Sequence, residues 1–218
     1  MNKGVSPYDI RHQVKSNWIY ELPFGEGHRW RASNGALDRI IGGWEFHGIA
    51  RLQSGRPFKL TSGRATVNGS DAGVIPKVSR DKLQEMVRII KMPDKRVLFV
   101  DPRLIGPDGR ANPEFLETPT TPGQFGTYLH LYGPRLIRFD LSAVKKTRIN
   151  ESWNVEIRAE FLNAFNNPNF LVGGATAAQV TQSIQGTSFG RTTEAYSDIS
   201  TTNDPGGRII QLVLRINF

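Results

Sequence analysis

Apolar residues recur at every second position over most of the last eleven residues of the chain, 208–218 (RIIQLVLRINF). Large apolar groups occupy every even position from Ile210 to Phe218, and polar residues share the odd positions with Ile209 and Val213. Because successive side chains of a β-strand point to opposite faces, this segment predicts a strand with one continuous apolar face. Its length matches the about nine to eleven residues with which a tilted strand crosses a bilayer.

Four earlier segments repeat this alternation. In the clearest of them, Trp153, Val155 and Ile157 alternate with Asn154, Glu156 and Arg158. Apolar and polar residues that alternate in this way, between turn-forming residues, indicate strands. The sequence therefore predicts an all-β fold of about five antiparallel strands in up-and-down order. We expect them near residues 9–22, 44–54, 137–149, 153–165 and 208–218.

The apolar phase also sets the register of the hairpin formed by 137–149 and 153–165, because a shift of one residue would move every apolar side chain to the wrong face. The register that matches both faces leaves a three-residue turn at 150–152. It leaves Lys145 on the apolar face, where we expect its ammonium to reach lipid headgroups or a bulge to reverse the phase. Opposite pairs are then Lys146 and Glu156, Leu141 and Phe161, and Ile149 and Trp153.

Two long connections separate the strands, and their Gly, Pro, Ser and Thr content predicts loops over 62–136 and 166–207. Within the first loop, Ser79 predicts the cap of a short helix that runs through Met92, because Leu83, Met86, Val87 and Ile90 follow helical spacing. A further extended piece is expected through Phe58 and Leu60, and a helical turn at an interface over 36–41.

Most aromatic residues of the expected strands lie near the same end of the predicted sheet. If the strands form a meander, the short turn at 150–152 lies at the end that carries the C-terminus, and both long loops lie at the other end. Aromatic belts, short turns on one side and long loops on the other are typical of outer-membrane barrels. The predicted aromatic belt consists of Trp18, Tyr20, Trp44 and Trp153, with Phe218 at the same end.

The polar faces of the strands would line the lumen of such a barrel. Their charged residues could form a substrate path or could pair across strands in a wet wall, and cross-strand pairing is the interpretation we favour. The predicted lumen-facing residues are Arg11, Lys15, Arg51, Glu156, Arg158, Glu160 and Arg215.

Composition narrows the classes of function. The formal charge of +8 suits anionic partners, but the basic residues are scattered and accompany no nucleic-acid-binding motif, so we expect no nucleic-acid partner. Cysteine is absent, the four histidines lack metal-ligand spacing, and no nucleophile motif, P-loop or dinucleotide fingerprint occurs. Carboxylate pairs such as Asp140 with Glu160, or Glu45 with Glu156, arise on one face of alternating strands by default. We expect no enzyme, no cofactor and no metal site.

Several segments together resemble the C-terminal end of TonB-dependent outer-membrane receptors of the Oar-like type. They are YDIRHQV, YELPFG, GALDRIIGGWEFHGIARLQSGRPF, RFDLSAVKKTRI, RAEFLNAFNNPNF, FGR at Phe189, and the terminal IQLVLRINF. The resemblance covers nearly the whole chain and is weakest over 67–96. It implies a large protein with a carboxypeptidase-regulatory-like domain, a plug and a barrel of about 22 strands, which takes up a bulky ligand with energy delivered through TonB.

This resemblance implies that residues 1–218 are the C-terminal portion of such a barrel in the outer membrane. The chain would then be a fragment without the signal sequence, TonB box, plug and most strands, and would meet TonB only through the missing N-terminal part. Its other partners would be outer-membrane lipid, the upstream plug and strands, and the barrel-assembly machinery, which reads a terminal signal formed by Leu212, Leu214, Ile216 and Phe218. The alternative is a soluble all-β binding module whose loops recognise a partner.

Overall fold

The computed structural model describes residues 4–6, 8–25, 27–66, 69–150, 152–170, 172, 182–193, 195 and 206–218. The chain divides into two compact units, each assembled from separate stretches. We call one the sheet unit, which comprises Val14–Leu52, Ile137–Pro168 and Ser197–Phe218. The other, the loop unit, comprises Met1–Gln13, Gln53–Leu136 and Asn169–Tyr196.

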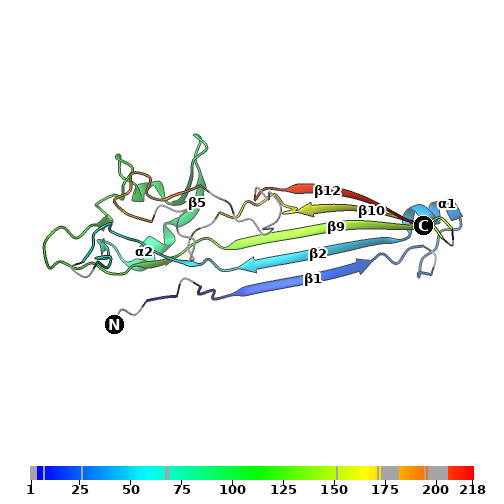
Figure 1. The fold of residues 1–218 in the computed structure, drawn as a ribbon, viewed down its shortest axis with the longest axis horizontal. Helices are drawn as coiled ribbons and strands as arrows, with labels where there is room; N and C mark the ends of the chain where they lie inside the picture. Colours follow the sequence, from blue (N-terminus) through cyan, green and yellow to red (C-terminus); the bar gives the residue numbers. More distant parts are fainter. Residues whose placement is uncertain are drawn as a thin grey trace. The chain divides into compact units, whose positions relative to one another are not determined.

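Five long strands form the sheet unit, and neighbouring strands run in opposite directions (Figure 1). They follow the order of the chain, as an up-and-down meander requires. The two outer strands are edges, so the sheet is not closed and represents an incomplete barrel wall. The predicted all-β, antiparallel class is confirmed. The strands, in order across the sheet, are β1 (Gln13–Glu21), β2 (Trp44–Gln53), β9 (Leu136–Arg148), β10 (Asn154–Leu162) and β12 (Ile209–Asn217).

The register between β9 and β10 is the predicted one. Glu156 lies opposite Lys146, and Phe161 lies opposite Leu141. At the turn, the Asn150 side-chain oxygen accepts hydrogen bonds from the backbone N–H groups of Ser152 (3.0 Å) and Trp153 (2.8 Å). An Asn side chain that satisfies local backbone donors in this way stabilises a tight turn. The apolar phase and the turn chemistry therefore agree on one register.

Two ends of the predicted strands differ from the structure by more than one residue. The segment 9–22 forms a strand only from Gln13 to Glu21. The segment 153–165 stops at Leu162, because Asn163 has a positive φ of 49° and leaves the extended conformation. The buried Asn163 amide donates hydrogen bonds to the backbone oxygens of Asn167 (3.1 Å) and Gly206 (2.9 Å). Asn tolerates the left-handed conformation better than most residues, so a side-chain hydrogen-bond network ends this strand.

The connection between β1 and β2 contains helix α1 (Gly35–Ile41), close to the predicted helical turn at 36–41. Asn34 caps it, since its side chain accepts hydrogen bonds from the N–H groups of Ala36 and Leu37. The backbone approaches itself closely beside this helix, where a Cβ on Gly42 would lie 2.7 Å from the Cα of Gly25. Figure 1 shows α1 at the same end of the sheet as the C-terminus.

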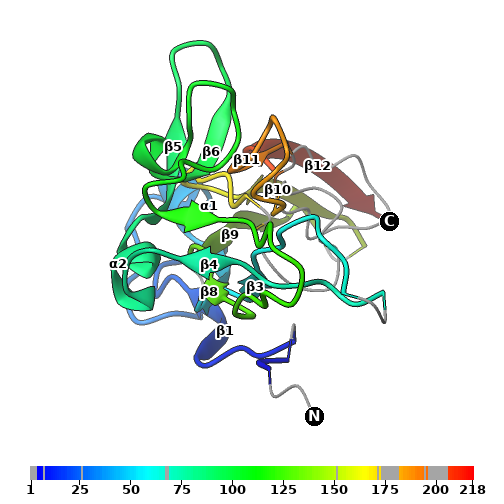
Figure 2. The same cartoon turned by 90° about the vertical axis from the view of Figure 1, so that its left-hand side faces the viewer.

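Residues 62–136 are not the loop that their composition predicts. They contribute most of the loop unit, whose short strands pair antiparallel in small sheets (Figure 2). The predicted extended piece at Phe58 lies in one of these strands. The paired strands are β3 (Pro57–Lys59) with β8 (His130–Tyr132), β4 (Ile75–Pro76) with β7 (Leu116–Glu117), and β6 (Val97–Val100) with both β5 (Val87–Lys91) and β11 (Arg191–Thr192).

A hydrophobic core holds the loop unit together. Phe58 and Phe99 meet edge to face at its centre, with ring centroids 5.4 Å apart. The second predicted loop, 166–207, contributes buried residues as well, although much of it lies outside the described residues. Burial of a common apolar core from two distant stretches is what makes this unit compact. The core includes Leu60, Leu83, Leu104, Leu131, Ile184 and Phe189.

The helix predicted from Ser79 to Met92 is shorter than expected. Ser79 caps α2 (Arg80–Glu85) by accepting a hydrogen bond from Lys82 N–H. The helix ends at Glu85, and β5 begins at Val87. The residues of β5 pair with β6 across a register shift. Val and Ile pack well in a strand. These residues therefore form a strand that pairs with β6, although their spacing would also fit a helix. A short 3₁₀ helix, η1 (Pro102–Leu104), follows β6.

Candidate functional site

The sheet unit has an exposed apolar face. On β12, the predicted terminal-signal residues Leu212 and Leu214 are 76% and 64% exposed, and Ile216 and Phe218 are exposed as well. In the register with β10, Leu212 lies opposite Ala159 and Leu214 opposite Ile157. Contiguous large apolar groups on a sheet face are unfavourable in water and favourable against lipid hydrocarbon. This face extends to the other strands through Val14, Tyr20, Phe46, Leu52 and Ile157.

The predicted belt residues lie on or beside this face. Trp153 stacks against Phe218 with ring centroids 5.6 Å apart, and the Trp44 indole N–H donates to the Ile40 carbonyl oxygen of α1 (2.9 Å). Tyr20 is exposed near the end of β1. Trp18 lies further from that end, and its ring covers Gly48, where a Cβ would lie 2.1 Å from the Trp18 ring. Glycine is required at that position because the indole occupies the space.

Lys145 lies on the apolar face, opposite Ile157, without any bulge in the register. Its ammonium donates to the backbone carbonyl oxygens of Arg39 (2.6 Å) and Gly42 at the end of α1. Backbone carbonyls at a helix end have no intrahelical partner, and a cation stabilises them. This contact accounts for a lysine that the alternation alone leaves unexplained.

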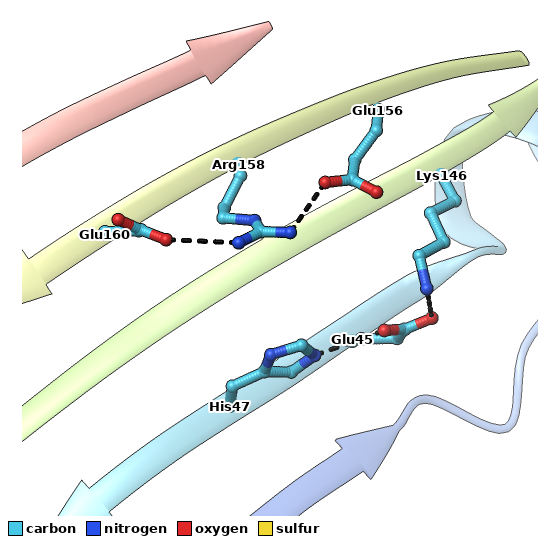
Figure 3. Close-up of polar contacts among 6 residues, drawn as sticks. All are labelled: Glu45, His47, Lys146, Glu156, Arg158 and Glu160. Carbon is cyan, nitrogen blue, oxygen red and sulfur yellow. Dashed lines mark hydrogen bonds and ion pairs between the residues drawn. The ribbon is translucent and has the colours of Figure 1, made fainter. Parts of the chain in front are cut away.

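The opposite face of the sheet is polar and carries ion pairs, one between strands and others within a single strand (Figure 3). Lys146 on β9 donates to Glu45 on β2 (2.6 Å), and the same carboxylate lies 3.1 Å from the His47 ring. On β10, Arg158 donates to Glu156 (2.8 Å) and to Glu160 (3.3 Å). Of the predicted lumen-facing residues, Glu156, Arg158 and Glu160 thus form one ion-paired row.

Three other predicted lumen-facing residues lie on the sheet as well. Arg215 on β12 is opposite Glu156 in the register. Lys15 and Arg51 line a cavity of about 220 Å³ together with Arg138 and Asp140. Arg138 is buried, and its Nε donates to both oxygens of Asp140 (3.1 and 3.2 Å). Sequence reasoning missed this pair, although two opposite charges spaced by two residues on one strand face predict it.

Arg11 does not lie on the sheet. It precedes β1 and belongs to the loop unit, where its guanidinium lies 4.2 Å from the ring centroid of Tyr132. Its assignment to the polar face followed from the assumption that the first strand begins near residue 9. The neighbouring Asp9 accepts a hydrogen bond from the Tyr132 hydroxyl (3.0 Å), so both residues are engaged by β8 instead.

The carboxylates of the polar face accept hydrogen bonds from cationic side chains and from a backbone N–H group. Asp140 accepts hydrogen bonds from Arg138 and from the Asn163 N–H (2.7 Å), and Glu45 binds Lys146. These carboxylates are therefore engaged by groups of the sheet unit itself. In the described parts of the chain, no group of three His, Asp or Glu side chains could hold a metal ion.

A family model described as an outer membrane beta barrel domain matches residues 1–211. This chain belongs to that family. The family places the chain in the outer membrane, and the open five-stranded sheet with one exposed apolar face is the corresponding wall segment. Membership also decides between the two classes weighed from the sequence, in favour of the barrel over a soluble binding module. No curated protein and no solved structure matches the chain. No helix in the described parts of this barrel domain has the length and apolarity needed to span a membrane.

Proposed function

We propose that this chain forms the C-terminal part of the barrel of a TonB-dependent receptor of the Oar-like type, which takes up a bulky ligand. The observation that carries the proposal is the open sheet itself, with an exposed apolar face, an ion-paired polar face and a terminal aromatic residue. Five strands cannot enclose an aqueous lumen, so the transport path requires further strands. The resemblance of the segments quoted above supports the receptor type.

The C-terminal strand β12 is the proposed signal for the barrel-assembly machinery. Leu212, Leu214, Ile216 and Phe218 form one exposed apolar row along the edge of the sheet. An edge strand offers unpaired backbone groups as well as side chains, so another protein can bind it by strand addition. This combination supports recognition of β12 during membrane insertion.

Ligand contact is proposed for the connections and not for the polar face. The ion pairs of Glu156, Arg158 and Glu160 satisfy one another, which supports a structural role in a wet wall. Residues 62–136 contribute most of a unit with its own apolar core, and a packed unit can present a rigid binding surface. We propose no catalytic activity and no cofactor for the chain, and energy would reach the receptor through TonB and the upstream plug.

The receptor proposal can be tested in cells that express the native gene. An antibody against the loop unit would recover the protein after formaldehyde cross-linking of intact cells. We expect an outer-membrane polypeptide much larger than 24.4 kDa, which contains a plug and is cross-linked to TonB. Dissipation of the proton-motive force is expected to reduce the cross-link. An outer-membrane polypeptide that carries no plug and never cross-links to TonB would contradict the proposal.

A further inference from the structure

A second cavity lies in the sheet unit, between the connection that carries α1 and the end of β9. Its volume is about 500 Å³, and it is formed by residues near 38–43 and 145–150, with His28. It lies at the end of the sheet that carries the short hairpin turn, where the aromatic residues Trp44 and Trp153 also lie. None of the roles described above uses this cavity.

The lining of the cavity is strongly cationic. The residues that line it include four cationic ones, Arg39, Lys145, Lys146 and Arg148, and one carboxylate, Asp38, which also lies 3.6 Å from the Arg31 guanidinium. That carboxylate is buried and already accepts a hydrogen bond from Ala32 N–H (2.7 Å). The positive charge of the cavity is therefore only partly compensated within the sheet unit.

The four cations differ in how they are held. Lys146 is paired with Glu45, and Lys145 uses two of its three N–H donors on the carbonyl oxygens of Arg39 and Gly42. Arg39 and Arg148 are exposed, and the Arg148 Nε donates to the Asn150 carbonyl oxygen at 3.3 Å. The two arginines are therefore the groups best able to turn their guanidinium donors toward a ligand.

An exposed apolar surface adjoins the cavity. Leu37 and Ile40 on α1 are 50% and 66% exposed, and Lys145 stands on the apolar face with its ammonium 5.7 Å from the centroid of the Trp44 ring. The same patch thus offers cations, an aromatic ring and exposed aliphatic side chains. A small soluble anion needs the cations alone, whereas a membrane lipid needs both parts.

We infer that this cavity binds the headgroup of an anionic glycerophospholipid from the membrane leaflet at the short-turn end. The phosphate would interact with Arg39 and Arg148, and the acyl chains would lie along the apolar face beside Ile40 and Trp44. Arginine suits phosphate because its planar guanidinium donates two parallel hydrogen bonds. A basic cluster next to a membrane surface attracts anionic lipid electrostatically.

The test uses the full 218-residue chain in a non-ionic detergent, with short-chain phosphatidylglycerol and phosphatidylcholine as probes and native mass spectrometry to count bound lipid. The variant Arg39→Gln/Arg148→Gln removes the two cavity arginines. Lys91→Gln/Lys95→Gln removes two exposed charges of the loop unit and is the matched control. Arg39→Lys/Arg148→Lys keeps the charge, and hydrogen exchange across β10 reports whether each variant retains the sheet.

We expect the unsubstituted chain to bind phosphatidylglycerol in preference to phosphatidylcholine. The Gln variant should bind phosphatidylglycerol roughly tenfold or more weakly, the loop-unit control should bind unchanged, and the Lys variant should recover most of the affinity. Equal binding of both lipids, or an unchanged affinity in the Gln variant, would overturn the inference. Displacement of the lipid by inorganic phosphate alone or by an acidic peptide would also overturn it, because the apolar surface would then play no part.

Discussion

At the scale of single residues, buried charges in this chain are held by several donors at once. The Asp101 carboxylate is buried in the loop unit. It accepts hydrogen bonds from the Arg103 side chain (3.0 and 3.2 Å), the Arg103 backbone N–H (3.1 Å) and the Arg88 side chain (2.5 Å). The Arg103 side chain, followed by its backbone N–H and by Arg88, lowers the pKa of Asp101 from 3.8 to about 2. Because Asp101 also caps η1, it ties the end of β6 to the following turn.

The variant Asp101→Asn is expected to loosen this part of the loop unit. The exposed arginines are partly screened by solvent, so the expected loss at neutral pH is about 1–2 kcal/mol. Hydrogen exchange of peptides that cover residues 97–104 measures it locally. Asp94→Asn is the control, because Asp94 pairs with Arg96 at the surface and should change little. Equal protection in both variants would contradict the role of Asp101.

The same residue predicts a pH dependence with a definite sign. A carboxyl group whose pKa is lower in the folded state stabilises that state fully above its unfolded pKa, and the contribution disappears as pH falls through the folded pKa. The Asp101 contribution should therefore be complete above about pH 4 and disappear toward about pH 2. Pepsin cleavage of the 97–104 region should accelerate across this range in the unsubstituted chain. In Asp101→Asn the acceleration should be smaller.

Lys145 is a cation on the apolar face of the sheet, opposite Ile157. Its hydrogen bonds to Arg39 and Gly42 connect β9 to the end of α1. We expect Lys145→Met to keep the apolar stem against Ile157 but to release the carbonyl groups of α1. Hydrogen exchange of the Gly42 amide, which bonds to Asp38 O, should accelerate on the order of tenfold. In the control Lys146→Met, which breaks the pair with Glu45 instead, this amide should stay protected.

At the scale of elements, β10 carries an ion-paired row on one face and the exposed Ile157 on the other. Arg158 serves both Glu156 and Glu160, so its removal would leave two like charges close together on one strand face. Interacting groups of this kind are not additive when substituted. The row therefore behaves as one unit, and substitution of single members overstates the contribution of each.

Arg158→Met is expected to destabilise the detergent-folded chain by about 1–3 kcal/mol. The triple variant Glu156→Gln/Arg158→Met/Glu160→Gln should recover more than half of this loss, because no charge is left unpaired. Urea unfolding followed by tryptophan fluorescence in micelles compares the two free energies of unfolding. Losses that simply add from one substitution to the next would show that the three side chains act independently.

The strands of the sheet unit could be predicted because a single physical rule shapes them. Each is long, with one face mostly apolar and the other mostly polar, and the shared phase also predicts the register between β9 and β10. The end of β10 could not be predicted, since Asn163 leaves the strand through contacts with Asn167 and Gly206 that are not visible locally. The exposed apolar row of β12 follows from the alternation, but the partners of Lys145 and Arg11 do not.

The loop unit resisted prediction for a related reason. Its strands have two to five residues, too few to show a period, and its core joins residues as distant as Phe58 and Phe189. The helical spacing of Val87 and Ile90 is real, yet the same residues pair with β6 in a sheet. Only the tertiary partner decides between the two, and a single sequence does not reveal it.

At the scale of the whole molecule, the two units differ in the surroundings in which each is expected to be stable. The loop unit buries an apolar core of its own, whereas the sheet unit presents its large apolar side chains to the outside. A core that excludes water is stable in plain buffer, but an exposed apolar sheet face is satisfied only by lipid or detergent. Membership in an outer-membrane barrel family agrees with this division. The edge strands of the open sheet also offer backbone groups that a further strand could pair with.

The two units should therefore respond separately to detergent. In plain buffer we expect the isolated chain to aggregate, with hydrogen-exchange protection in residues 97–104 and none in β10. Detergent should add β structure by circular dichroism and protection across β10. It should not produce the heat-modifiable gel mobility of a closed barrel, because β1 and β12 have no second neighbouring strand among the described residues. The variant Leu212→Glu/Leu214→Glu should weaken the detergent-dependent step alone, since both side chains lie on the apolar face.

A soluble monomer that unfolds cooperatively in buffer, with β10 protected, would contradict the lipid-facing assignment, because that face would then have to be buried within the protein itself.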